Sequence, residues 1–280
     1  MPITTHRKEN NMDFKFDHDL HIHSKISSCS NHPEQTTENI LAYAKKNGLT
    51  TICLTDHYWD ERVAGPSEWY APQNTAHIKE ALPLPKEEGI RFLFGCESEM
   101  RADMTIGISR ERFDELDFVI IPTTHMHMKE FTVPQEYAGK ADMLAKLWVD
   151  KLETLLAMDL PFEKIGIAHL ACYLIGGGED ALYQNTLAAL KDEDLRRVFA
   201  LAAKKGVGIE INQGDFAFKH GAKEDILRIF GIAKAEGCKF YLGTDAHEPE
   251  GFIGAEERFT TAIRLLGLTE EDKFVPATAR

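Results

Sequence analysis

The sequence predicts an α/β fold in which parallel strands alternate with helices and close into a barrel. Short apolar runs alternate with amphipathic segments along the chain, a rhythm typical of repeated βαβ units. Seven such units follow one another without a long linker, which favours a barrel over an open sheet. The chain has 280 residues, 43% of them hydrophobic, enough for one barrel domain with a core of its own.

The expected strands are the apolar runs, and the expected helices carry apolar residues at helical spacing. The strands are predicted at 17–22, 51–55, 91–96, 117–121, 165–168, 207–211 and 239–243. The helices are predicted at 37–46, 141–158, 193–205, 224–236 and 256–266. Thr37 is expected to cap the first helix, and a glycine follows all but the second within two residues, as is typical of helix ends.

The amino terminus and the cysteines indicate where the protein works. Residues 1–12 are polar and lack the hydrophobic region of a signal peptide, so we expect a leader at 1–12 and one domain at 13–280. No apolar run approaches the roughly 18 residues of a membrane span. The five cysteines are scattered and form no C-x-x-C pair, which is typical of reduced thiols. We therefore expect a cytoplasmic protein with no membrane partner.

The net charge of −13 argues against nucleic acid as a partner. A nucleic-acid binder would carry a basic stripe. A small phosphorylated substrate is still compatible with this charge, because bound cations can reverse the local field.

Histidines and carboxylates gather where the expected strands end. The residues at these positions are His21, His23, Asp56, His57, Glu97, His125, His127, His169, Asn212, Asp245 and His247. In a βα barrel the carboxyl ends of the strands form the active-site face, so these side chains are expected on one rim. Imidazole and carboxylate ligands suit zinc, manganese or iron. Eight of these residues are candidate ligands, which is too many for one ion and predicts two to three divalent ions. Glu97 could bridge two of them.

Six motifs, taken in order, resemble those of the PHP (polymerase and histidinol phosphatase) superfamily. They read DLHIHS (19–24), TDH (55–57), GCE (95–97), TH (124–125), AH (168–169) and GTDAH (243–247). The resemblance spans 19–247 and implies a distorted (β/α)7 TIM-like barrel with a trinuclear metal centre that hydrolyses phosphoesters. It further implies that one ion is held by His21, His23, Glu97 and Asp245. Glu97 would bridge to a second ion on His125 and His169, while His57 and His247 would hold a third.

The loop after the first motif departs from the family pattern. Family members often supply a further His or Asp to the third ion from this loop, whereas SKISSCSNHP (24–33) offers Cys29 and His32. A thiolate at Cys29 would favour zinc. The alternative interpretation is a buried thiol on a turn.

The expected reaction is attack on a phosphate monoester by a metal-bridging hydroxide. Asp245 or His247 would protonate the leaving group, and Glu97 would hold the metals that carry the nucleophile. Substrate contacts are expected from Arg101, His127, Lys219 and His220, each of which could equally be a solvated side chain.

Several functions share these residues. A histidinol-phosphatase-like phosphomonoesterase fits the chain length and motif order best. The alternatives are a nucleotide phosphatase or nuclease using the same centre, a metal-dependent C–N hydrolase, and a metal-binding module without catalysis. The fold alone does not separate them.

Overall fold

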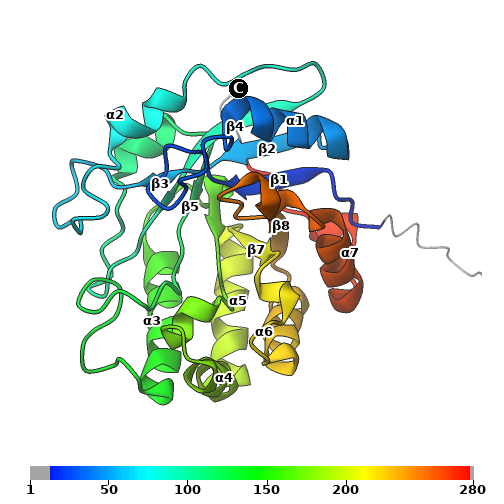
Figure 1. The fold of residues 1–280 in the computed structure, drawn as a ribbon. Helices are drawn as coiled ribbons and strands as arrows, with labels where there is room; N and C mark the ends of the chain where they lie inside the picture. The colour runs from blue at the N-terminus through cyan, green and yellow to red at the C-terminus, as the bar shows by residue number, and fades with distance from the viewer. Residues whose placement is uncertain (1–12, 278–280) are drawn as a thin grey trace, which may run out of the picture.

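The computed structural model describes residues 13–277, which form an α/β barrel built on a ring of seven parallel strands (Figure 1). In ring order these are β1 (His18–Ile22), β2 (Thr51–Leu54), β4 (Arg91–Ser98), β5 (Phe118–Ile120), β6 (Ile165–Ile167), β7 (Gly208–Asn212) and β8 (Lys239–Gly243). A two-residue strand, β3 (His57–Tyr58), pairs with the end of β4. The predicted distorted α/β barrel of seven parallel strands is confirmed, although the connection from β4 to β5 contains no α-helix.

The seam between β1 and β8 closes the ring partly through side chains. Asp245 donates its backbone N–H to the carbonyl of His21 at 2.7 Å, and His23 donates to the carbonyl of Ala246 at 3.1 Å. Nearer the start of β1, the Asp19 carboxylate accepts from the backbone N–H of Thr244 at 3.0 Å. Because side chains replace part of the backbone ladder, the barrel is distorted at this seam.

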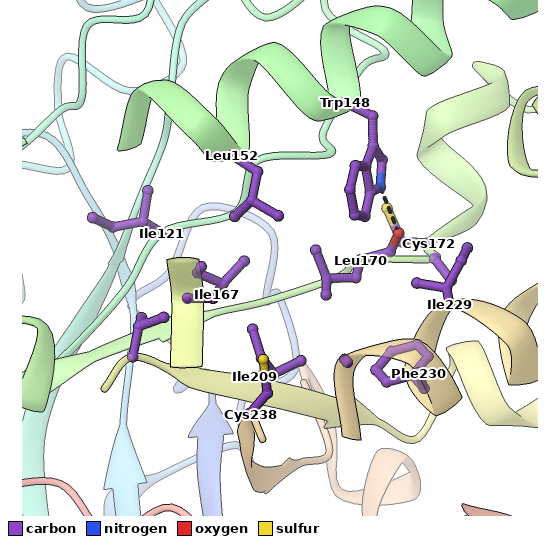
Figure 2. Close-up of a cluster of buried hydrophobic side chains, with 14 of the residues drawn as sticks. Ile121, Trp148, Leu152, Ile167, Leu170, Cys172, Ile209, Ile229, Phe230 and Cys238 are labelled. Carbon is purple, nitrogen blue, oxygen red and sulfur yellow. Dashed lines mark hydrogen bonds between the residues drawn. The ribbon is translucent and has the colours of Figure 1, made fainter. Parts of the chain in front are cut away.

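The helices lie outside the strands (Figure 1). They are α1 (Thr37–Asn47), α2 (Thr75–Ile78), α3 (Ala141–Ala157), α4 (Asp180–Ala189), α5 (Asp192–Lys205), α6 (Lys223–Ala235) and α7 (Ala255–Leu266). Figure 2 shows how α3 packs on the strands: Leu152 lies over Ile167 and Trp148 over Leu170, and the Trp148 indole donates to the carbonyl of Leu170 at 2.9 Å. This apolar layer fixes the strand ends that carry the polar residues.

The structure differs from the expected elements in three places. Thr36, not Thr37, caps α1, since its hydroxyl accepts from the backbone N–H of Asn39. The sequence did not predict α4, which shares the β6–β7 connection with α5, nor the short β3 and α2 in the long connection between β2 and β4. The expected leader at 1–12 lies outside the described residues, so its division from a domain at 13–280 stays a prediction. Among residues 13–277, no helix is long and apolar enough to cross a membrane.

Candidate metal centre

Eight side chains from the carboxyl ends of the strands converge on one point above the barrel. They are His21, His23, His57, Glu97, His125, His169, Asp245 and His247. All but Asp245 and His247 are at least nine-tenths buried. Seven of them, together with Cys29, fall into two groups of four donor atoms, and within each group all atoms lie within 4.8 Å of one another. That spacing is close to the span of two metal–ligand bonds of about 2.0–2.3 Å each.

The first group joins two imidazoles to two carboxylates: His21, His169, Glu97 and Asp245. The Nε2 atom of His21 lies 3.4 Å from Glu97 Oε2 and 3.3 Å from Asp245 Oδ1. The Nε2 atom of His169 lies 3.3 Å from Glu97 Oε1 and 3.7 Å from Asp245 Oδ2.

The second group joins three imidazoles to a thiol: His23, His57, His247 and Cys29. Glu97 links the two groups, since its Oε2 atom lies 3.2 Å from both His23 Nε2 and His57 Nδ1. The resemblance implied that His23 shares an ion with His21. Their Nε2 atoms are only 3.1 Å apart, so the assignment of each histidine to an ion stays a prediction.

His125 lies outside both groups but beside the first. Its Nε2 atom is 4.0 Å from Glu97 Oε1, and its ring centroid is 4.8 Å from that of His169. It therefore faces the same Glu97 oxygen as His169 does.

Four of the imidazoles are held through Nδ1, and in His21, His23 and His125 the Nε2 atom faces Glu97. His21 donates from Nδ1 to Glu210 Oε1 at 2.6 Å, and His125 donates from Nδ1 to Glu99 Oε2 at 2.9 Å. The Nδ1 atom of His247 donates to the carbonyl of Asp245 at 2.7 Å, and that of His23 lies 3.3 Å from the Ser27 hydroxyl. Partners of this kind fix the ring and the tautomer of metal-binding histidines.

Sequence reasoning missed Glu210 and Glu99. Glu210 is a charged residue in the middle of the buried strand β7, which is unusual enough to signal a role. Glu99 follows Glu97 by two positions, which places both side chains on the same side of the chain. Asp56, also listed among the strand-end residues, belongs to neither donor group and accepts from the backbone N–H and the hydroxyl of Ser24.

The donor atoms fit divalent cations. Both carboxylate oxygens of Glu97 and the Nδ1 atom of His57 are buried without a hydrogen-bond partner, a costly state unless another ligand satisfies them. Burial lowers the pKa of His57 well below its usual range, which keeps the neutral imidazole that a metal requires. Burial also disfavours charge on His21, but Glu210, Asp245 and Glu97 raise its pKa well above the usual range. The centre thus favours positive charge.

Two of the candidate ligands have a strained backbone. His169 and Asp245 adopt φ values of 60° and 54°, in the left-handed region that non-glycine residues rarely occupy. The Thr124 hydroxyl holds the carbonyl of His169 in place. Such strain is concentrated at functional sites, where the surrounding structure maintains it.

A cavity of about 630 Å³ opens from the centre towards the loops after β6 and β7. Its inner wall holds the carboxylates and most of the histidines. Its outer wall is aromatic: the Tyr173 and His220 rings stack with centroids 3.5 Å apart, beside Tyr183 and Phe218. Asp215, which the sequence did not single out, also lines it, and burial raises its pKa to about 7.

The cavity contains only some of the expected substrate contacts. His127, Lys219 and His220 line it. Arg101 does not: its guanidinium lies over the ring of Phe131 and 3.0 Å from Asp103, so the expectation of a phosphate contact is corrected. His32 belongs to neither donor group, and its Nδ1 atom accepts from the backbone N–H of Glu34.

The family model described as the PHP domain matches residues 19–214 of this chain. The chain belongs to the PHP domain family. It is 24% identical over 221 residues to a probable phosphatase from Caldicellulosiruptor saccharolyticus, covering 78% of this chain and 76% of that protein. It is 25% identical over 231 residues to the probable phosphatase YcdX of Escherichia coli, covering 82% of this chain and 78% of that protein.

A solved structure shares the fold. It is the histidinol phosphate phosphatase HISK from Lactococcus lactis, complexed with zinc, L-histidinol and phosphate, with a TM-score of 0.55 and 18% identity. The match covers 92% of this chain and 98% of that one. The family and its probable phosphatases identify the present chain as a metal-dependent phosphoesterase, a hydrolase.

Proposed function

We propose that this PHP-family protein removes phosphate from a small phosphate monoester whose leaving group carries a planar ring, as L-histidinol phosphate does. The observation that supports this most is the cavity, which places a flat aromatic wall opposite the cluster of unsatisfied metal donors. The fold neighbour was solved with zinc, L-histidinol and phosphate, which is consistent with a ligand of this class. The cytoplasmic location stays a prediction.

The candidate ligands would be the eight side chains at the strand ends, holding two to three zinc, manganese or iron ions. Bound divalent ions supply a hydroxide nucleophile near neutral pH and neutralise charge on the phosphate oxygens. Glu97 positions the two donor groups relative to each other, because one of its oxygens faces both. Glu210 and Glu99 hold His21 and His125 in the orientation that points Nε2 at the centre.

The leaving alkoxide needs a proton, and Asp215 fits this role better than Asp245. Burial disfavours the charged form of Asp245, but His21, His247 and His169 lower its pKa far below the usual range, which suits a ligand. Asp215 has a pKa of about 7 and lines the cavity. Its Oδ2 atom accepts from the backbone N–H of Ala171 at 3.2 Å, so Oδ1 would carry the proton.

The outer wall would bind the ring of the leaving group. The stacked Tyr173 and His220 rings offer a flat surface, and ring stacking contributes about 0.5–1.5 kcal/mol beyond area burial. A nucleobase is also planar, so a mononucleotide is the second candidate. The net charge of −13 still argues against a polynucleotide.

The test is phosphate release by zinc- or manganese-loaded protein from L-histidinol phosphate, a mononucleotide and an aryl phosphate, with an amide substrate for C–N hydrolysis. We expect the highest kcat/KM for L-histidinol phosphate. Glu97→Gln should reduce kcat/KM about 10³-fold or more, whereas the exposed Glu88→Gln should not. Tyr173→Ala should raise KM about 2- to 10-fold for ring-bearing substrates only. Amide hydrolysis without phosphate release would contradict the proposal.

A further inference from the structure

We infer that His23, Cys29, His57 and His247 form a thiolate-bearing metal site that prefers zinc, next to a site of different ligand chemistry that does not discriminate in this way. The four donor atoms lie within 4.8 Å of one another. The neighbouring group contains only imidazole and carboxylate donors, from His21, Glu97, His169 and Asp245. One chain would thus hold two unlike ions side by side.

The turn that carries Cys29 is attached to the other three ligands of this group. The Ser27 hydroxyl accepts from the backbone N–H of His57 at 3.2 Å and lies 3.3 Å from His23 Nδ1. The Cys29 thiol in turn donates to the Ser27 hydroxyl at 3.4 Å. The Ser30 hydroxyl donates to the carbonyl of His247 at 2.5 Å. The sulfur is therefore positioned by the same contacts that position the imidazoles.

The His57 side chain gives independent evidence for a ligand at this place. It is 7% exposed, and its Nδ1 atom is buried without a hydrogen-bond partner. The rings around it are close: the centroids of His23 and His57 are 4.6 Å apart, and those of His23 and His247 are 4.4 Å apart. The Nδ1 atom also lies 3.2 Å from Glu97 Oε2, which is itself buried without a hydrogen-bond partner. Two unsatisfied buried donor atoms this close together, beside further imidazoles, point to a cation between them.

The different donor sets predict different metal preferences. Thiolate is a soft ligand that favours zinc, whereas carboxylates are hard ligands that also suit manganese. A ligand set of three imidazoles and one thiolate offers four donors, the usual number for zinc. The group of two imidazoles and two carboxylates suits manganese, iron or zinc. When zinc and manganese are both supplied, the group with the thiolate should therefore bind zinc, whereas the group with two carboxylates should accept either metal.

The other cysteines do not compete for this assignment. Cys53, Cys96, Cys172 and Cys238 are buried and belong to neither donor group. Cys172 also lines the cavity, but its sulfur lies 3.9 Å from the Thr124 hydroxyl and 3.7 Å from the Thr124 carbonyl. Cys172→Ser is therefore a matched control: it removes a cavity thiol that is not a proposed ligand.

The test is cobalt titration of the full chain, followed by a sulfur-to-cobalt charge-transfer band. We expect one equivalent of cobalt per chain to produce the band in the wild type and in Cys172→Ser, and no band in Cys29→Ser. In parallel, metal content is measured after dialysis against increasing chelator. Cys29→Ser should lose one zinc ion at a chelator concentration at least about tenfold lower than the wild type does. Protein loaded with manganese alone should retain one ion fewer than protein loaded with zinc.

Three outcomes would overturn the inference: no charge-transfer band in the wild type, a band that persists in Cys29→Ser, or equal retention of zinc and manganese by both sites. Thermal unfolding of each variant shows whether a lost band reflects a lost fold, and Cys29→His provides a second variant. It should retain zinc but show no band. None of these measurements uses a phosphoester. A failed phosphatase assay with an intact band would therefore contradict the proposed function and leave the thiolate site standing.

Discussion

At the amino end of the barrel a buried histidine has hydrogen-bond partners within the protein, whereas at the carboxyl end several buried polar atoms have none. Strand β1 reaches both ends, with His18 at the first and His21 at the second. At the amino end, His18 donates from Nδ1 to Asp17 at 2.8 Å and accepts at Nε2 from the backbone N–H of Leu242 at 3.0 Å. At the carboxyl end, His57 Nδ1 and both oxygens of Glu97 are buried without such partners. Polar groups that the protein itself satisfies serve stability, whereas unsatisfied ones indicate a ligand.

Further contacts at the amino end support this difference. Lys273 binds Asp17 at 3.0 Å and Glu270 at 2.7 Å, which fixes the chain after the last helix. Phe274 then inserts into the barrel, where it belongs to an apolar cluster with Phe118 and Tyr241. This end is closed by ion pairs and aromatic packing.

Removal of metal should affect the carboxyl end alone, and it is the largest effect we expect. Chelation should abolish phosphate release, because the nucleophile and the charge neutralisation are lost together. It should also lower the free energy of unfolding, by about 2.7 kcal/mol if the ions were present at 100 times their Kd. The measurements are turnover and chemical unfolding before chelation, after it, and after zinc is restored. Full turnover in chelated protein would refute the idea that the unsatisfied groups at the carboxyl end hold catalytic metal ions.

Asp215→Asn should reduce kcat about 10²-fold or more, since the general acid is removed. The pH profile is the sharper measurement. A carboxyl group with a pKa of about 7 is protonated below that value, so wild-type activity should fall as the pH rises through about 7. The variant should lack this decline, and the exposed Asp114→Asn should retain it. An unchanged profile in Asp215→Asn would assign the proton donor elsewhere.

Glu210→Gln should weaken metal binding about 10- to 100-fold, as is usual when a group that orients a metal-binding histidine is lost. The carboxylate fixes His21 through Nδ1 and also accepts from the backbone N–H of His169 at 3.1 Å, so one substitution disturbs two candidate ligands. Metal content after graded chelation measures the change, with Glu88→Gln as the control. Equal metal retention in both variants would show that His21 needs no such support.

The sequence predicted the barrel and the rim better than the network beneath the rim. The strands and most helices follow from apolar periodicity, which depends on residues near in sequence. The eight candidate ligands at the strand ends could be singled out because parallel strands bring their carboxyl ends to one face. The pairing of Glu210 with His21 depends on two strands 189 residues apart, and no local pattern reveals it.

Arg101 shows why a local argument can also mislead. Arg101 follows Glu97 closely in the sequence, and this proximity suggested a position near the rim of the barrel. The chain instead turns after β4, and the guanidinium packs against Phe131. A cation–π contact with Phe131 and an ion pair with Asp103 hold it there, and neither is visible in the sequence.

The smallest expected effect tests the amino end through His18. Burial lowers the pKa of His18, so its contribution to stability is present above the unfolded value of 6.5 and is lost as the pH falls below it. Protonation at Nε2 would break the bond from the Leu242 N–H group. His18→Phe leaves that N–H group without its acceptor and should cost about 1–3 kcal/mol at pH 8. Chemical unfolding of wild type and variant measures the difference, which should shrink towards pH 5 because only the wild type has the titrating group.

Metal content should be the same in wild type and His18→Phe at pH 8, because His18 contacts none of the donor atoms in either group. That result would separate the two ends of β1, one of which stabilises the barrel seam while the other holds the proposed ions. A variant that loses metal together with stability would show instead that the seam transmits strain along β1 from His18 to His21, only three residues away. The two ends of β1 would then depend on each other, and the amino end could not be assigned to stability alone.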